Sequence, residues 1–221
     1  MDITNLLKER KSVRAFLNKE VDDKKIEIIL EGLKHTASGS NMQPWLIHVV
    51  SGNTKKMIDK KTLKAFDAGD QTNMDYPYYP ETIPALYQKR RKETGLQLYN
   101  SLNIKKEDKE RRIKQWRANY DAFGSPVILY FFMDNELTTG SYIDMGMAIQ
   151  STLILAQEQG LATCTMASLA EYPDIVREVL KIDNTKALIC GIALGYEDKE
   201  AKINSYRTPR LKIEEFSTFY K

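Results

Sequence analysis

The sequence predicts a single domain of the α/β or α+β class, because long helical patterns alternate with only a few strands. A length of 221 residues suits one domain. A composition of 42% hydrophobic and 29% charged residues is typical of soluble globular proteins. The strands are too few for a complete doubly wound sheet. We find no repeat, low-complexity tract or linker, so we expect one unit spanning residues 1–221.

The rarer residue types exclude several kinds of protein. The two cysteines, Cys164 and Cys190, are too few for a disulfide framework, and we interpret them as reduced, buried thiols. The two histidines, His35 and His48, lack a metal-ligand partner at useful spacing, so no metal site is predicted. A net charge of +3 does not demand a nucleic-acid partner. The basic run 89–92 stands among acidic residues, and we interpret it as a solvated helix face.

The N-terminal residues and the longest apolar run bear on localisation. The chain begins with a charged segment that has no apolar signal core. The longest uncharged run lies between Asp144 and Glu158 and has 13 residues, whereas a membrane span needs about 20. We therefore expect a cytoplasmic protein with no membrane partner.

Helical patterns dominate the first half of the chain. Apolar residues recur at helical spacing after Asp22 or Asp23, and either aspartate can cap that helix. We expect, in order, a short helix ending at Arg10, the capped helix through Leu33, a strand at 46–50, a lysine-rich helix at 54–66, an ordered loop at 68–84, and two charged helices near 81–99 and 106–121.

The second half contains the most apolar segments. Residues 127–133 and 186–194 predict two buried strands, and the tail from Tyr196 is expected to be irregular. Between the strands, Ser141 and Asp144 have the spacing of a capping box at the start of a helix that ends at Gly160. This helix has almost no polar face, so it is either the central core helix or part of a large homodimer interface.

The first motif that indicates a binding site is Arg10-Lys11-Ser12-Val13-Arg14-Ala15-Phe16. If the segment is extended, Arg10, Ser12 and Arg14 point the same way, because side chains alternate along a strand. Two guanidinium groups and a hydroxyl on one face suit an anion such as phosphate. The alternative is a solvated basic strand edge.

The second motif is the run from Ala37 to Trp45, which lies between a predicted helix and a predicted strand. The Asn41 and Gln43 amides can pair with a ligand edge that both donates and accepts hydrogen bonds. Ser38, Gly39 and Ser40 allow a flat ligand to approach the backbone closely. The alternative is an ordinary helix-to-strand turn.

Taken in this order, the two motifs resemble the FMN-dependent nitroreductase family. The resemblance continues through nearly the whole chain, although Ala37 stands where many members have proline. It rests further on Ser125-Pro126-Val127, Asp144-Met145-Gly146, Gly160-Leu161-Ala162-Thr163, Ala193-Leu194-Gly195-Tyr196 and Arg207-x-x-Arg210.

The resemblance implies a fold and an assembly. The implied fold is an α+β, three-layer, nitroreductase-like fold in which a mixed, mostly antiparallel central sheet is flanked by helices. The implied assembly is a homodimer with two FMN sites at its interface. Within a single FMN-binding domain of residues 1–221, we expect a substrate-side insertion at about 68–122 and a C-terminal tail at 196–221.

The resemblance also implies a role for each matched residue. Arg10 and Ser12 match contacts to the FMN phosphate and ribityl chain, with Lys11 between them. Arg14 matches the cation at the pyrimidine edge of the flavin, where hydride arrival leaves negative charge. Ser38, Ser40, Asn41 and Gln43 match flavin contacts that come partly from the other subunit. Ala167 and Ser168 match a turn whose backbone N–H meets flavin N5. Arg210 matches a contact to the phosphate, and Arg207 matches a helper at the same group.

The substrate side has weaker signals. Tyr78 and Tyr79 lie on a proline-stiffened segment where flat aromatic substrates could stack, and Phe123 precedes a core strand where the family often lines its pocket. The alternative is a loop that simply packs on the body. No side chain stands out as a catalytic nucleophile, because Cys164 has no basic neighbour in sequence.

The implied activity is an FMN-dependent NAD(P)H oxidoreductase that reduces nitroaromatic, quinone or similar acceptors by a ping-pong mechanism. NADH and NADPH remain equally open as donors. Alternatives are reductive dehalogenation of aromatic rings on the same flavin fold, and a non-enzymatic flavin-binding or nucleic-acid-binding module. The sequence lacks a P-loop motif and a Gly-x-Ser-x-Gly motif, which disfavours those enzyme classes.

Overall fold

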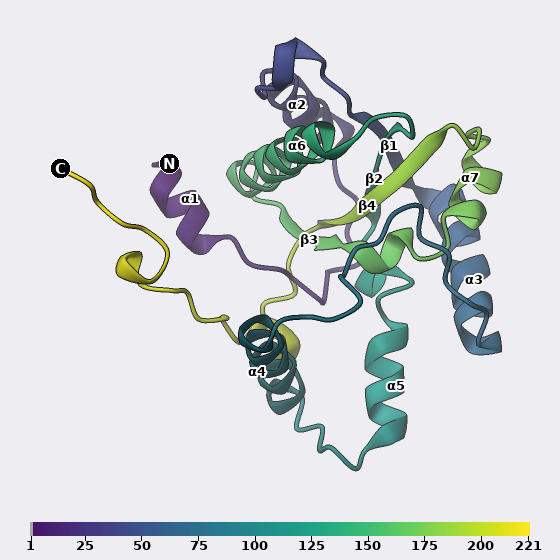
Figure 1. Cartoon of the computed structure of the whole chain (residues 1–221). Helices are drawn as coiled ribbons and strands as arrows, with labels where there is room; N and C mark the ends of the chain where they lie inside the picture. Colours follow the sequence, from purple (N-terminus) through teal and green to yellow (C-terminus); the bar gives the residue numbers. More distant parts are fainter. Residues whose placement is uncertain (1) are drawn as a thin grey trace.

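The central sheet has the strand order β1-β2-β4-β3 in the computed structural model, which describes residues 2–221 (Figure 1). The strands are β1 (Leu46–Ser51), β2 (Val127–Asp134), β3 (Ala162–Met166) and β4 (Lys186–Gly195). All three pairings between these strands are antiparallel. A parallel bridge joins Ser12 to Thr163 of β3, so the mixed, mostly antiparallel sheet predicted above is confirmed.

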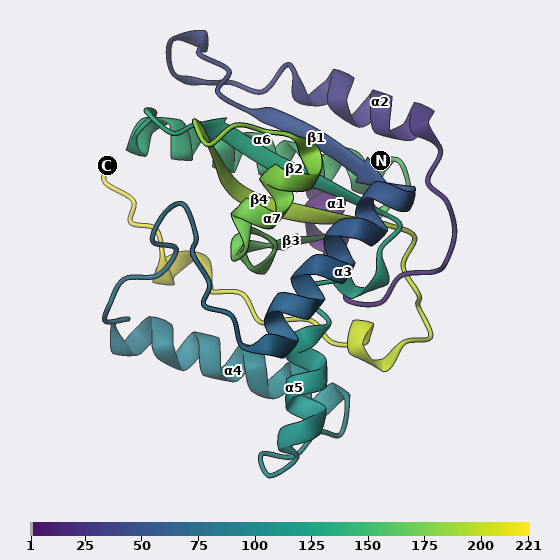
Figure 2. The same cartoon turned by 90° about the vertical axis from the view of Figure 1, so that its right-hand side faces the viewer.

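Helices cover both faces of the sheet, and alternate residues of β2 enter two separate cores. Val127, Leu129 and Phe131 pack on the side of α2 (Asp23–Leu33) and α6 (Thr139–Glu158). Ile128 and Tyr130 pack on the side of α3 (Gly52–Ala68) and α7 (Pro173–Leu180). Because both faces of the sheet are buried, β2 and β4 are apolar along nearly their whole length. Figure 2 shows α2 and α3 on opposite sides of the sheet, which gives the three layers.

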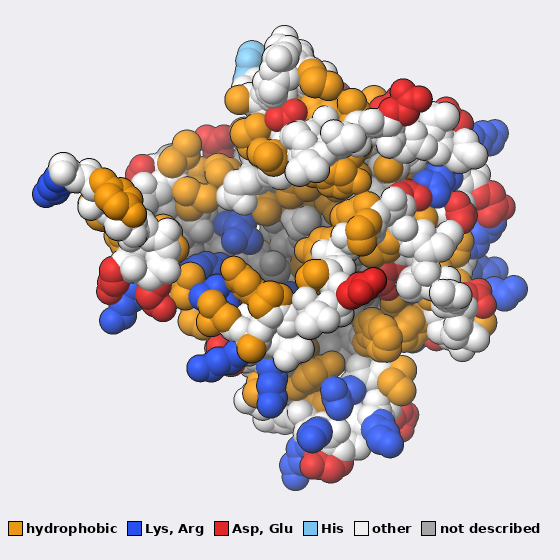
Figure 3. Space-filling model, viewed as in Figure 1, with side chains coloured by type: hydrophobic (Ala, Val, Ile, Leu, Met, Phe, Trp, Pro, Cys, Tyr) orange, Lys and Arg blue, Asp and Glu red, His pale blue; other side chains and the backbone are white. Residues whose placement is uncertain are grey.

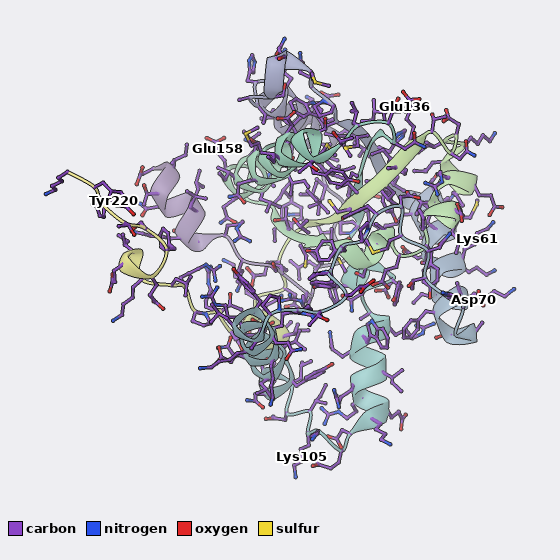
Figure 4. The ribbon with its side chains drawn as sticks, viewed as in Figure 1. Lys61, Asp70, Lys105, Glu136, Glu158 and Tyr220 are labelled. Carbon is purple, nitrogen blue, oxygen red and sulfur yellow. The ribbon has the colours of Figure 1, made fainter. Side chains whose placement is uncertain are left out.

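Three helices lie outside these layers. They are α1 (Ile3–Glu9), α4 (Ala85–Ser101) and α5 (Lys109–Arg117), and in Figure 1 α4 and α5 project below the sheet. The tail from residue 196 passes α4 and ends on the same side of the molecule as α1. Figure 4 shows Tyr220 at the far end of this tail, where its side chain is 92% exposed.

Most predicted elements are confirmed, and four details differ. The predicted capping box is wrong, because α6 begins at Thr139 and both Ser141 and Asp144 are buried within it. The Asp144 carboxylate instead accepts a hydrogen bond from the backbone N–H of Gly39, at 3.0 Å. The sequence analysis did not predict strand β3 or helix α7. Helix α5 is shorter than predicted: it spans Lys109–Arg117, and the left-handed residues 122–124 then turn the chain toward β2.

Within residues 2–221, no helix combines the length and the apolar character that crossing a bilayer requires.

Candidate functional site

The segment from Arg10 to Phe16 is an extended strip along the free edge of β3. The backbone N–H of Val13 donates to the carbonyl of Thr163 at 2.9 Å, and Ser12 forms the parallel bridge to the same residue. Val13 is 2% exposed and faces inward. Arg10, Ser12 and Arg14 line one cavity, as the predicted alternation requires, and the intervening Lys11 lines it too.

This cavity has a volume of about 310 Å³ and lies between the strip, α4 and the tail. In Figure 3, Lys and Arg side chains gather at the hollow beside α1 and the tail. No acidic residue lines the cavity within residues 2–221. Its lining residues are Arg10, Lys11, Ser12, Arg14, Thr94, Tyr206, Arg207, Thr208, Pro209 and Arg210.

Four arginines line this cavity, and within residues 2–221 no carboxylate lines it to neutralise them. Burial, followed by repulsion from Arg210 and Arg207, lowers the pKa of Arg10. The Nε of Arg10 is buried and has no hydrogen-bond partner among residues 2–221. A buried unpaired donor is costly, and a phosphate would supply both its acceptor and the missing negative charge. The residues present therefore fit the phosphate of FMN.

Arg207 and Arg210 are held in different ways. The Arg207 guanidinium donates to the carbonyls of Lys8 at 3.0 Å and Arg10 at 2.9 Å, and also to that of Glu9, so it caps the C-terminal end of α1. Arg210 donates to Thr208 and Pro209 in its own segment. Arg207 thus contributes positive charge to the cavity while its hydrogen bonds stabilise α1.

Lys11 and Arg14 both contact the start of the tail. The Lys11 ammonium lies 2.6 Å from the Glu197 carboxylate and donates to the carbonyl of Asn204, also at 2.6 Å. The Arg14 guanidinium donates to the hydroxyl of Tyr206 at 3.0 Å. The positive charge of Lys11 is therefore neutralised within the chain, whereas that of Arg14 remains beside the cavity.

Asn204 fixes the strip and was missed by the sequence analysis. It is 3% exposed, and its side chain accepts from the backbone N–H of Arg14 at 2.8 Å. The same side chain donates to the carbonyls of Ala15 and Asp198, both at 2.9 Å. Tyr206 and Thr94 were also missed. A polar tail without periodicity gives no sign that one amide organises a segment so distant in sequence.

The Ser38–Gln43 loop forms a second, separate cluster. Ser40, Asn41 and Gln43 have φ angles of 49°, 58° and 48°, a left-handed conformation that is unusual outside glycine. Such strain concentrates at binding sites. The side chains of Ser40, Asn41 and Gln43 are exposed, and no residue of this loop lines the cavity at Arg10. A single chain therefore does not bring the two predicted clusters together.

Ala167 and Ser168 are connected to the cavity through β3. They begin a 3-10 turn, Ala167–Ala170, that directly follows the strand paired with Ser12. Both residues are half-buried. The turn packs tightly on β4, because a Cβ added at Gly191 would lie 2.5 Å from Leu169 Cδ1.

The predicted substrate residues lie in two places. The Tyr76 hydroxyl donates to the carbonyl of Ile189 at 2.7 Å, which anchors the 68–84 loop and leaves Tyr78 and Tyr79 exposed at 48% and 53%. Phe123, which has a φ of 55°, lines a second cavity of about 360 Å³ together with Arg14. Phe123 is thus close to the candidate site, whereas Tyr78 and Tyr79 line neither cavity.

Both cysteines are buried, in agreement with the sequence analysis. Burial raises the pKa of the Cys164 thiol and raises that of Cys190 to about 12. Neither thiol has the thiolate character of a nucleophile.

Comparisons with known proteins show similarity along the chain. The family model described as the nitroreductase family matches residues 7–196. A 4-nitrobenzoate reductase from Pseudomonas putida is 32% identical over 218 residues, which cover 99% of this chain and 95% of that relative.

Solved structures show the same similarity in three dimensions. The FMN and NADPH-dependent nitroreductase NfnB from sphigopyxis sp. strain HMH matches with a TM-score of 0.96 and 32% identity, and the match covers 100% of both chains. The FMN-dependent nitroreductase NfnB from Mycobacterium smegmatis, solved in complex with NADPH, matches with a TM-score of 0.94 and 29% identity over 99% of this chain and 97% of the other. These matches span the body, the 68–122 segment and the tail.

Proposed function

Because the chain belongs to the nitroreductase family, we propose that it is an FMN-dependent oxidoreductase that uses NAD(P)H to reduce nitroaromatic compounds. Similar proteins named above reduce 4-nitrobenzoate or depend on FMN and NADPH. Quinones and similar electron-poor rings are further acceptors that the same reaction would reduce.

The observation that carries this proposal is the cavity of Arg10, Arg207 and Arg210. It gathers these three guanidinium groups together with Arg14. Among residues 2–221, no acidic residue lines it and the buried Nε of Arg10 has no partner. The doubly charged phosphate of FMN would neutralise this cluster and satisfy that donor. When bound, FMN supplies the transfer of electrons from nicotinamide to acceptor, so no nucleophilic side chain is needed.

The chain's own residues hold a positive charge in place beside this cavity. Asn204 accepts from the backbone N–H of Arg14, and Tyr206 accepts from its guanidinium. An arginine held both at its backbone and at its guanidinium is preorganised to stabilise negative charge on a neighbouring ring edge. Phe123 forms an apolar wall next to it, which suits a flat acceptor.

The functional unit in this proposal is a homodimer. The exposed Ser38–Gln43 loop lies outside the cavity of its own chain, so its side chains would complete a cavity of the partner subunit. The apolar helix α6 leaves Ile143 64% exposed and Met147 38% exposed, as expected of a surface that a second copy covers. We place this dimer in the cytoplasm, where free thiols such as Cys164 and Cys190 remain reduced.

The test is an absorption spectrum of the purified protein, followed by anaerobic titration with NADPH or NADH. We expect flavin bands that bleach on addition of donor and return on addition of 4-nitrobenzoate, with parallel lines in steady-state kinetics. A colourless protein that binds no added FMN would contradict the cofactor assignment. Flavin that bleaches but is not reoxidised by nitroaromatic compounds would contradict the acceptor.

A further inference from the structure

Four consecutive cations on α4, Lys89 to Lys92, divide into two pairs by direction. Thr94 lines the cavity of Arg10, and its hydroxyl donates to the carbonyl of Arg90 at 3.0 Å. At about 100° per residue, Arg90 and Arg91 lie within about 60° of Thr94 around the helix axis. Lys89 and Lys92 lie about 140–160° away. The two arginines therefore share the cavity-facing side of α4, and the two lysines do not.

The Arg91 guanidinium is stacked on an aromatic platform. Its central carbon lies 4.1 Å from the centroid of the Tyr79 ring, and Tyr79 meets Tyr78 edge-to-face at 4.7 Å. Stacking fixes the plane of a guanidinium while its N–H groups stay free to bind an anion. Arg90 is half-buried, and its guanidinium lies 5.6 Å from the Tyr87 centroid.

Neither arginine is neutralised by a carboxylate. Among residues 2–221, no ion pair includes Arg90 or Arg91, although Glu93 lies on the same helix. The solvated helix face predicted from the sequence describes the exposed Lys89 and Lys92, whereas Arg90 is half-buried and Arg91 lies over the Tyr79 ring. Arg90 and Arg91 are separate from the Arg10, Arg207 and Arg210 cluster, and they lie about one helical turn from Thr94.

We propose that Arg90 and Arg91, with Tyr79 as platform, form a subsite for the ribose 2′-phosphate of NADPH and so make the enzyme prefer NADPH to NADH. This inference rests on the proposed function, in which a nicotinamide donor binds against the flavin whose phosphate occupies the cavity lined by Thr94. The 2′-phosphate is the group that distinguishes the two donors, and a pair of unneutralised arginines binds a dianion through charge-assisted hydrogen bonds.

The direct test is ligand binding to the FMN-loaded protein, measured by calorimetry. The probes are adenosine 2′,5′-bisphosphate, which carries the 2′-phosphate, and adenosine 5′-monophosphate, which lacks it. We expect the wild-type protein to bind the bisphosphate at least about tenfold more tightly, and Arg91→Gln to lose most of that difference. Lys92→Gln removes the same charge from the opposite face of the helix and should retain the difference.

Kinetics give a second readout through the ratio of kcat/KM for NADPH to kcat/KM for NADH. This ratio should fall about tenfold in Arg91→Gln, fall further in the Arg90→Gln, Arg91→Gln double variant, and stay unchanged in Lys92→Gln. An equal effect of Lys92→Gln, or equal losses for both donors, would overturn the inference, because either would indicate only general attraction or structural damage.

The two proposals fail in different ways. Flavin that neither donor reduces would contradict the proposed function, and the binding comparison would still decide the subsite. Flavin that both donors reduce equally well, together with equal binding of the two adenosine probes, would overturn the subsite and leave the proposed function intact.

Discussion

At the scale of single residues, Arg10 has an unusual environment for a guanidinium group. Other cations surround it, and its buried Nε has no partner among residues 2–221. We predict that Arg10→Gln raises the Kd of the apoprotein for FMN by about 10- to 100-fold, because it removes one to two charge-assisted hydrogen bonds. FMN fluorescence titration measures this change. The control, Lys8→Gln, removes an exposed cation of α1 and should leave the Kd unchanged.

His48 makes the free energy of unfolding depend on pH. Burial on β1 lowers its pKa, so the folded state keeps the imidazole neutral where the unfolded chain binds a proton. The unfolded state therefore holds more protons below about pH 6.5, and stability falls as the pH drops through this range, by at most about 1.4 kcal/mol per pH unit for one proton.

We predict that His48→Gln flattens the pH dependence of the free energy of unfolding between about pH 5 and 7. Urea unfolding at a series of pH values measures this slope. The chain has only two histidines, so His35→Gln, at an exposed position, is a matched control that should keep the wild-type slope. A His48→Gln slope identical to wild type would show that another group is responsible.

The sequence predicts single residues well where a local rule applies. The alternation of Arg10, Ser12 and Arg14 follows from strand geometry alone, and all three line one cavity. Asn204 could not be predicted, because it pairs with the backbone of Arg14, 190 residues away along the chain. Likewise, only the folded chain shows that Glu197 neutralises Lys11.

At the scale of elements, the close contact between β4 and the Ala167–Ala170 turn depends on a glycine. We predict that Gly191→Ala destabilises the protein by about 1–3 kcal/mol, because the added methyl group would meet Leu169 at 2.5 Å. Gly95→Ala in α4 meets nothing within 4 Å and should stabilise the protein by about 0.5–1 kcal/mol. Thermal unfolding distinguishes the two, and similar shifts would contradict the packing described here.

Elements with a marked apolar pattern were predictable, including the short strand β1, whereas β3 was not. Strand β2 and helix α6 stand out because each has a long apolar pattern. Strand β3 has five residues with no such pattern, and its identity as a strand comes from pairing with β4. The predicted capping box failed because the Asp144 carboxylate bonds to Gly39 in another element.

At the scale of the whole molecule, the exposed face of α6 is the feature that a monomer does not explain. We predict that the protein elutes at about twice the 25.4 kDa mass of one chain, and that Ile143→Asp shifts it toward the monomer and weakens FMN binding. Light scattering after size exclusion measures the mass. Ile113→Asp on α5 changes a residue of similar exposure, 54%, and should leave the mass unchanged.

The sequence analysis predicted two clusters of flavin-contact residues, but it could not place them relative to each other. Arg10 to Arg14 lie on the edge of β3, whereas Ser38 to Gln43 lie on an exposed loop held by α6. This separation depends on how whole layers stack, which no local pattern encodes. The family resemblance supplied the assembly that would unite them.

The double use of Arg207 has a physiological consequence. Its guanidinium caps α1 and also lies near the positive charges of Arg10 and Arg210. The tail, residues 196–221, is therefore least stably packed when no anion neutralises these three arginines. In cells that lack riboflavin, newly made protein would therefore unfold first at its C-terminal tail. Proteases would degrade this FMN-free protein faster than the FMN-loaded protein.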